Sequence, residues 1–409
     1  MTVQDYLSKM GKIQTSILAF IDDDDSSATG FMKLIQIFQN QKILNNQHEL
    51  KSLLHILSNI ADNHHRGPNF IDKIQQIIKF LKIYMKKFFS DFSIFNIFAS
   101  NKRILLFLLK EKILTMNKAT TSILTKSDSY YKKANYPQYL FNEIQPFLDD
   151  ESIQKITRKL PENYDKRLLL SGENDSHICE LIRSDMIDDF IEFVGKEKVP
   201  LKSEIEESIF ETNPFLINKK VSLIEYAAFF GSAGIFKHLL NSGIAAGPSL
   251  WKFAVHGRNN DIIHLLEEKK IEPEDKIECY EEAIKCHHNE IARYIKNKFF
   301  TKEDEKSRDL FIQYLQYYNV SLIQPNSVDS SSFFNLCQYD YFQPVSILSK
   351  NEIIDINQIS IFYIEYLFNY FRHYFNSIRH QIFQFHSTSN ISISFNIKYF
   401  NKIQHQIFQ

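Results

Sequence analysis

Apolar residues recur at intervals of three and four positions along the first part of the chain, which is the spacing of one helix face. Polar stretches such as DDDDSSATG (22–30) and HHRGPN (64–69) separate these segments and are predicted to be solvated loops. Asn69, Asp72 and Asp91 stand where helix starts are expected. The predicted helices cover residues 6–21, 31–44, 48–60, 70–89 and 101–116.

A longer repeat of apolar positions begins at residue 178. The second position follows the first by four residues, the third lies eight further on, and the last two lie three and four beyond it. These spacings place the residues on one face of two short helices, and the glycines Gly231 and Gly257 indicate a tight turn between them. Each copy is therefore predicted to be a helix, a turn and a helix. The five copies are Ile178, Ile182, Phe190, Phe193 and Val194; Ile224, Ala228, Phe236, Leu239 and Leu240; Leu250, Ala254, Ile262, Leu265 and Leu266; Cys279, Ala283, Ile291, Tyr294 and Ile295; and Phe333, Cys337, Val345, Leu348 and Ser349.

A single helix pair of this kind cannot bury its apolar stripe, whereas stacked neighbours can. The pattern therefore predicts an all-α fold built as a helical-repeat solenoid. Small residues at the second position, among them Ala228, Ala254 and Ala283, suit close contact between copies. The segment 90–114 follows a shortened form of the same pattern, so the solenoid is predicted to begin well before residue 170.

The stretch CYEEAIKCHHNEIARYIKN (279–297) raises the question of a metal site, because it holds two cysteines and two adjacent histidines. A structural zinc site needs four convergent ligands, and only Cys286, His287 and His288 are local. We interpret Cys279 as a stacking position, Cys286 as the substitute for the turn glycine, and His287 as a turn residue. The expectation is no metal ion and no cofactor.

Catalytic motifs are also missing from the sequence. It contains no phosphate-binding glycine loop, His-Glu-x-x-His pair, EF-hand or serine-nucleophile elbow. The carboxylate runs at 22–25 and 188–189 lie on polar faces, where solvated side chains are commoner than catalytic ones. We expect a protein that is not an enzyme.

Charge is distributed unevenly although the formal net charge is only −1. Residues 79–118 hold nine Lys/Arg and two acidic residues, and residues 173–207 hold eleven Asp/Glu and four Lys/Arg. The preferred interpretation is two solvated helical faces. The alternative is a polarised surface that steers a charged partner, or a nucleic-acid or anionic-surface binder that uses segment 79–118.

The beginning of the chain, MTVQDYLSKMGKIQ, lacks the apolar run of a signal peptide. The longest apolar runs, such as ILLFLL (104–109), are too short to span a bilayer. We expect an intracellular, cytoplasmic protein with no membrane span and with reduced cysteines.

The stretch SLIEYAAFFGSAGIFKHLLNSGI (222–244) resembles the ankyrin-repeat pattern: Ser222 takes the Thr place, Ala227 and Ala228 the alanine pair, and Gly231 the glycine. Together with GENDSHICELIRSDMIDDFIEFV, PSLWKFAVHGRNNDIIHLLEE and EEAIKCHHNEIARYIKN, it is similar to the ankyrin-type domain of unknown function that many paralogues carry in some protists. The second positions are 46, 26, 29 and 54 residues apart, in contrast to the regular 33 of ankyrins. The longer gaps hold the insertion KSEIEESIFETNPFLINKK and a predicted helix with a loop.

The resemblance implies an ankyrin-like solenoid with four parts. These are an N-terminal helical region of possibly degenerate repeats (1–170), ankyrin-like repeats (171–300), a connecting helix or loop with the last repeat (301–357), and an aromatic-rich tail (358–409). The tail has two interpretations: a frameshifted or mispredicted end, or a helix that caps the array.

The function that the resemblance implies is non-catalytic binding of a protein partner through the concave face of the solenoid. A truncated, non-functional paralogue is a further alternative to the nucleic-acid binder. The sequence identifies neither the partner nor the oligomeric state. The two residues after each second position are implied to face the groove; they are Phe229, Phe230, Val255, His256, Ile284, Lys285, Gln338 and Tyr339.

Overall fold

The computed structural model describes residues 2–23, 28–67, 69–127, 129–162, 164, 166–301, 310–324 and 327–351. Residues 1–351 form one compact unit, and the end of the predicted part 301–357, from residue 352, and the tail (358–409) lie outside the described residues. In the described ranges every regular element is a helix, and strand pairing is limited to an isolated bridge between Glu204 and Ser222. The all-helical part of the fold prediction is therefore confirmed. None of these helices is long and apolar enough to cross a membrane.

Four long helices begin the chain and match the predicted segments. Polar caps fix the starts of the first and the third: the side chain of Thr2 accepts a hydrogen bond from the amide of Asp5, and the side chain of Asn46 accepts from the amides of His48 and Glu49. The helices are α1 (Val3–Asp22), α2 (Ala28–Asn40), α3 (Gln47–Asn63) and α4 (Phe70–Phe88), with the short η1 (Ile43–Asn45) before α3.

Shorter helices follow and lead to the repeats. The segment predicted to be a shortened copy forms a helix pair, α5 and α6, in which Phe95 and Leu105 are buried. The elements are α5 (Asp91–Phe98), α6 (Lys102–Lys110), α7 (Lys118–Thr125), α8 (Tyr130–Lys133), α9 (Tyr136–Tyr139), α10 (Phe141–Ile144), η2 (Gln145–Phe147), α11 (Asp150–Thr157) and α12 (Lys166–Ser171).

A helix pair forms at each of the five predicted copies. A residue with positive φ stands between the two helices of every pair, and in the second pair this residue is Gly231. The other four are Asp185, Arg258, His287 and Asp340. The pairs are α13 (His177–Arg183) with α14 (Ile187–Glu197), α15 (Leu223–Phe230) with α16 (Ala233–Asn241), α17 (Leu250–Gly257) with α18 (Asn260–Glu268), α19 (Lys276–Lys285) with α20 (Asn289–Phe299), and α23 (Phe333–Gln338) with α24 (Phe342–Asn351).

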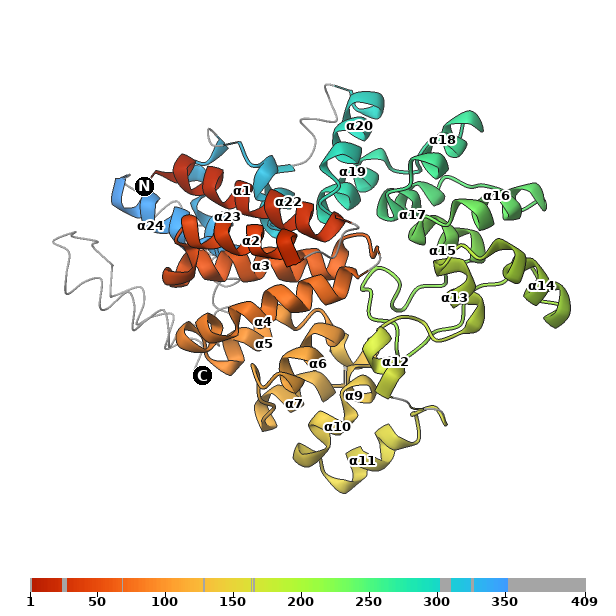
Figure 1. Ribbon diagram of the computed structural model, residues 1–409, viewed down its shortest axis with the longest axis horizontal. Helices are drawn as coiled ribbons and strands as arrows, with labels where there is room; N and C mark the ends of the chain where they lie inside the picture. The colour runs from red at the N-terminus through yellow and green to blue at the C-terminus, as the bar shows by residue number, and fades with distance from the viewer. Residues whose placement is uncertain are drawn as a thin grey trace, which may run out of the picture. The chain divides into compact units, whose positions relative to one another are not determined.

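The first four pairs follow one another in space as they do in the sequence (Figure 1). Each inner helix contacts the next: α13 contacts α15, α15 contacts α17, and α17 contacts α19. Among the outer helices, α14 contacts α16 and α16 contacts α18. All the apolar positions of the first four copies lie in one continuous core, either buried or packed against it. Each pair therefore hides its stripe against its neighbours, as the spacing requires.

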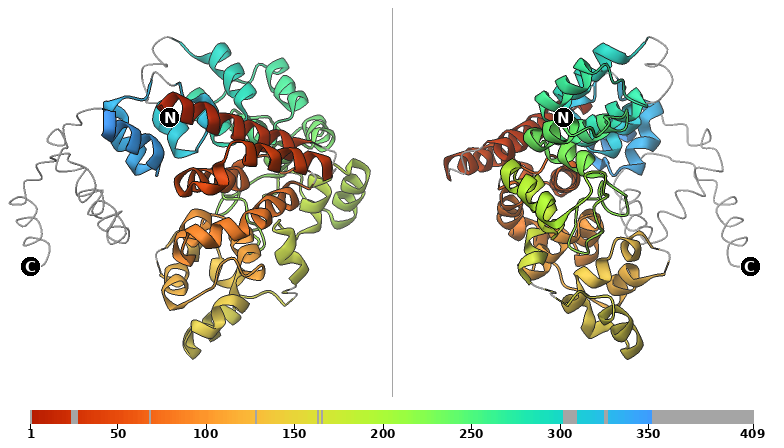
Figure 2. Two further views of the ribbon diagram at one scale, coloured as in Figure 1. Left: turned by 60° about the vertical axis from the view of Figure 1, so that its left-hand side comes forward. Right: turned by 90° about the vertical axis from the view of Figure 1, so that its right-hand side faces the viewer.

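The fifth pair has different surroundings. Between it and α20 lie α22 (Leu310–Gln316), η3 (Val320–Leu322) and η5 (Ser330–Ser332). Helix α24 packs against α1 and α3, and η3 also contacts α1. Figure 2 draws α24, in blue, near the marked N-terminus. The last described helices thus close the unit against the first ones, in place of extending the row of four pairs.

Gly257 differs from its predicted role as a turn residue. It is the last residue of α17, and the positive φ of this turn falls on Arg258. A Cβ atom at Gly257 would lie 2.1 Å from the carbonyl oxygen of Ala228 and 3.0 Å from the amide nitrogen of Gly231. Gly257 is needed because two neighbouring pairs approach each other closely there.

We expect Gly257→Ala to destabilise the fold by roughly 1–3 kcal/mol, since the added methyl group overlaps main-chain atoms that cannot move aside. Gly195 in α14 is the matched control, because a Cβ atom there meets nothing within 4 Å. Gly195→Ala should stabilise the protein by about 0.5–1 kcal/mol through helix propensity. Urea unfolding of both variants tests this, and equal effects would contradict the packing argument.

Candidate functional site

The eight residues predicted to face a groove do not form one exposed surface. Phe229, Val255, His256 and Ile284 are at most 2% exposed. The other four are half-buried, and two of these, Gln338 and Tyr339, belong to the separate fifth pair. A partner could reach the four buried side chains only by displacing parts of this chain, and binding at these positions stays a prediction.

The insertion between α14 and α15 covers part of the inner helices. Its Phe215 ring stacks on Phe229 at 5.5 Å between centroids and meets Phe253 and His256 edge-on or tilted, each at 5.1 Å. The ammonium group of Lys219 lies over the outer face of the same ring, 3.5 Å from its centroid. The insertion therefore supplies an apolar lid for the face that an ankyrin-like array would leave open.

The N-terminal helices cover the turns of the later pairs through polar contacts that range from the buried Gln14–His287 pair to the exposed Arg258–Asp22 pair. We call this set the polar seam: Gln14 with His287 and Asn319, His64 with Cys286 and Asp22, Arg258 with Asp22, and Lys51 with Asp340. The distances are 2.7–3.0 Å for the contacts of Gln14, 2.8 Å for both contacts of His64 and 2.7 Å for the Lys51–Asp340 pair. The seam fixes α1 and α3 along three successive turns.

Pairing in the seam changes the acidity of its two carboxyl groups. Burial alone would raise the pKa of Asp22, but the hydrogen bond and charge of His64 and the guanidinium of Arg258 lower it to about 2. Asp340 is similar: burial opposes the shift, and His55 and Lys51 hold the pKa at about 2. Both carboxylates therefore stay charged over the neutral pH range. In this form they keep the N-terminal helices bound to the later turns.

A buried ionic cluster joins the loop after α3 to the beginning of the repeats. The side chain of Arg66 is 5% exposed and lies 2.7 Å from Glu173 and 3.9 Å from Glu211. Burial, reinforced by the charge of Glu173, raises the pKa of Glu211 to about 7. Burial also raises the pKa of Asp62, which lies in the same region, to about 6. These pKa shifts arise because the carboxyl groups are buried at the contact between the loop and the first helix pair, where Arg66 lies between the two glutamates.

The basic segment 79–118 loses part of its positive surface in the folded chain. Lys102 is buried, donates to the carbonyl oxygens of Ala134 and Ile209, and has its pKa lowered to about 7 by burial. Arg103 is mostly buried, 3.9 Å from Glu173. The exposed cations that remain include Lys86, Lys87, Lys110, Lys112 and Lys118.

The most open part of the repeats is α14, the outer helix of the first pair. Phe190 is its one buried residue, whereas α16, α18 and α20 each bury three. Ile191 is 44% exposed and Met186, at the helix start, is 45% exposed. In the part of the chain that the structure describes, Asp188, Asp189 and Glu192 on this helix form no ion pair with another residue.

Two of the hollows in the described part of the unit bear on a possible ligand site. One of about 30 Å³ lies beside Lys102, Asn174 and Glu211 and has room for little more than a water molecule. A wider one of about 730 Å³ opens between α1 and η3 and is lined by residues such as Ser8 and Thr15. Its lining offers hydroxyl and amide groups and the ammonium group of Lys12, with no histidine or carboxylate beside them to form an acid–base pair.

Sequence reasoning missed the ionic cluster, and it also missed that Glu282 lies close to His256 and Cys286. Residue spacing carries no signal for Arg66 and Glu173, which are distant in the chain and meet only after folding. Glu282 and Cys286 do carry one, because residues four apart share a helix face. The approach of His256 to both depends on stacking of α17 against α19.

Residues 245–323 match a family described as "Domain of unknown function (DUF3447)". The match begins before α17 and ends after η3, so it supports the predicted domain of unknown function in this part of the chain. No curated protein and no solved structure match the chain.

We expect Arg66→Met to destabilise the protein by about 3–5 kcal/mol, because it leaves the buried Glu211 without its cation and Glu173 with only Arg103, 3.9 Å away. Arg293→Met on the exposed side of α20 is the control and should change stability by less than about 0.5 kcal/mol. Chemical denaturation measures both. Adding Glu173→Gln to Arg66→Met should recover part of the loss; no recovery would show that the cluster is not the cause.

Proposed function

We propose that the chain is a non-catalytic protein-binding module, and that residues 177–299 form an ankyrin-like solenoid. The support is the row of four helix pairs that share one core, together with glycine and alanine at the close contacts between pairs. Such arrays present side chains that can vary without disturbing the stack. The observation that carries the binding proposal is the open, partly apolar face of α14.

The proposed contact surface is the α14 face, defined by Met186, Ile187, Ile191 and Val194 with the carboxylates beside them. Ile187, Ile191 and Val194 follow one another at intervals of four and three, so they form a stripe along the helix. Ile191 is exposed, whereas Ile187 and Val194 are half-buried because they also pack against the core, so only part of each side chain is available to a partner. Each of the other three outer helices buries more of its stripe.

The chemistry of this face selects the kind of partner. Asp188, Asp189 and Glu192 border the apolar stripe, and residues 173–207 as a whole carry eleven acidic and four basic residues. A basic, amphipathic helix would place its apolar side on Ile191 and its lysines or arginines on the carboxylates. The apolar contact supplies affinity, and the charges supply orientation and faster association.

We expect a photo-crosslinking residue at position 191 to capture a discrete partner in cells, and Ile191→Asp to weaken that partner's binding about tenfold or more. The loss of an exposed apolar anchor causes this change, so the free energy of unfolding should move by less than about 0.5 kcal/mol. Crosslinking followed by titration of the purified partner measures the effect.

Ile83, on the basic face of α4 and 77% exposed, is the matched control position. Crosslinks at 83 and none at 191 would contradict the α14 face and favour the basic segment as the binding surface. Nucleic acid captured at position 83, with binding that falls steeply as salt rises, would identify the alternative function.

A further inference from the structure

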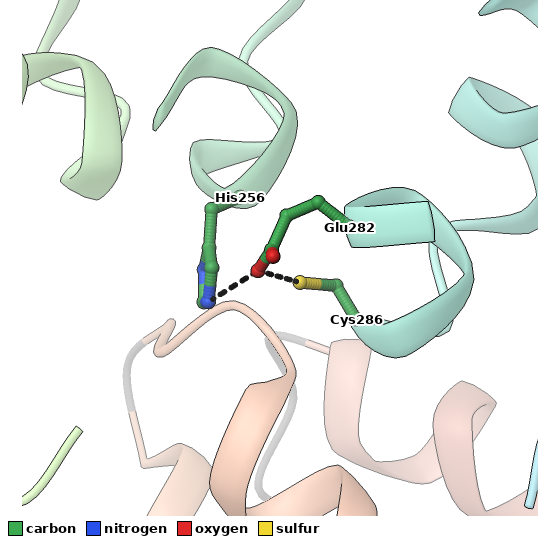
Figure 3. Close-up of side chains that lie close together, drawn as sticks. All are labelled: His256, Glu282 and Cys286. Atoms are coloured by element: carbon green, nitrogen blue, oxygen red, sulfur yellow. Dashed lines mark hydrogen bonds and ion pairs between the residues drawn. The ribbon is translucent and has the colours of Figure 1, made fainter. Parts of the chain in front are cut away.

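Three potential metal ligands from two neighbouring repeats meet inside the protein. His256 stands near the end of α17, while Glu282 lies on α19 and Cys286 directly follows it. Figure 3 shows the three side chains pointing at one another. The Nε2 atom of His256 lies 3.6 Å from Oε1 of Glu282, and the Sγ atom of Cys286 lies 3.5 Å from the same oxygen.

These separations match the edges of a metal coordination tetrahedron. With bond lengths of about 2.0–2.1 Å to nitrogen, 2.0–2.2 Å to oxygen and 2.3 Å to sulfur, tetrahedral Zn²⁺ ligands lie about 3.3–3.7 Å apart. The three ligand atoms all lie within 4.8 Å of one another, so a small adjustment of the thiol would complete one face of the tetrahedron. A neutral hydrogen-bonded pair would be closer, near about 3 Å between nitrogen and oxygen.

The imidazole of His256 is the feature that ordinary packing does not explain. It is 1% exposed, and neither ring nitrogen has a hydrogen-bond partner among the described residues. A buried imidazole without partners is costly, and such groups call for a specific explanation. A metal ion between its Nε2 atom and the two ligands on the α19 side would satisfy it.

Neighbouring groups hold the ligands in place. His288 donates from Nδ1 to the carbonyl oxygen of Val255, one residue before His256, at 3.0 Å. His64 donates from Nδ1 to the carbonyl oxygen of Cys286 at 2.8 Å. Lys285 lies 3.5 Å from Oε2 of Glu282, which leaves Oε1 directed at the other two ligands. Fixed ligands of this kind reduce the ordering cost of metal binding.

We propose that His256, Glu282 and Cys286 bind a zinc-like divalent metal ion that ties the third helix pair to the fourth. Imidazole, thiolate and one carboxylate suit Zn²⁺. They do not suit Mg²⁺ or Ca²⁺, which prefer ligand sets made of oxygen atoms alone. Binding replaces the thiol proton, which passes to solvent, with a metal–sulfur bond. Water can take the fourth position, and the side chain of Glu282, 11% exposed, marks the side on which the site meets solvent.

The test uses the full purified chain and Co²⁺, a spectroscopic substitute for Zn²⁺. Titration should produce visible bands typical of four-coordinate cobalt, a thiolate-to-cobalt band in the near ultraviolet, and a stoichiometry of one ion per chain. Zn²⁺ should displace the cobalt and raise the unfolding temperature. Circular dichroism checks that every variant is folded before its spectrum is compared.

Cys286→Ser should abolish the thiolate band, and Glu282→Gln and His256→Gln should each weaken binding at least tenfold. Cys279→Ser removes another buried thiol of the same helix, and His264→Gln removes an exposed imidazole of α18; both should bind cobalt like the parent chain. The proposal is overturned if the parent chain binds no cobalt, if the thiolate band survives Cys286→Ser, or if Cys279→Ser abolishes it as well. These readouts are independent of the α14 face.

Discussion

The polar seam is the constraint on which the arrangement of the unit depends, because buried polar groups must find partners wherever two layers of helices meet. Gln14, His64 and Lys51 reach from the first helices to turns that lie more than two hundred residues later in the chain. Both ring nitrogens of His64 face acceptors, a carbonyl oxygen and a carboxylate. Removing one member of the seam would leave its partner without a hydrogen bond, which is costly for a buried group. The seam therefore keeps the N-terminal helices packed on the later helix pairs.

The seam and the insertion together alter what a row of helix pairs can do. In an open array the inner helices and the turns would be available to a partner. Here Phe215 covers the side chains of Phe229 and His256, and α1 and α3 cover the turns of the later pairs. The exposed apolar side chains lie instead on the outer side of the first helix pair, because no helix pair precedes α14 in the row of four. The same coverage converts His256 from a candidate contact residue into a buried one.

The spacing of apolar residues predicted the helix pairs because helical periodicity is visible in the local sequence. The first four copies pack with their apolar stripes in one core. The fifth copy follows the same spacing, yet α24 packs on α1 and α3, since periodicity says which face is apolar and not which neighbour covers it. The role of Gly257 was misassigned for a related reason: a glycine near a turn and a glycine at a close approach look alike in the sequence. The residues of the groove were implied by a resemblance, and the burial of Phe229 and His256 under Phe215 depends on an insertion that the resemblance does not describe.

The cluster at His256 illustrates the physical limit of motif reading. Ligands that are close in sequence, such as Cys286, His287 and His288, diverge because they occupy a turn: His287 contacts Gln14, and His288 donates to Val255. Ligands that converge come from equivalent ends of successive inner helices, where stacking brings α17 and α19 together. Where successive helix pairs stack, side chains that meet in this way come from different pairs, and the spacing to search for is the distance between two pairs plus or minus one helical turn. His256 and Glu282 are 26 residues apart, where the second positions Ala254 and Ala283 of the same two pairs are 29 apart, and so fit that rule.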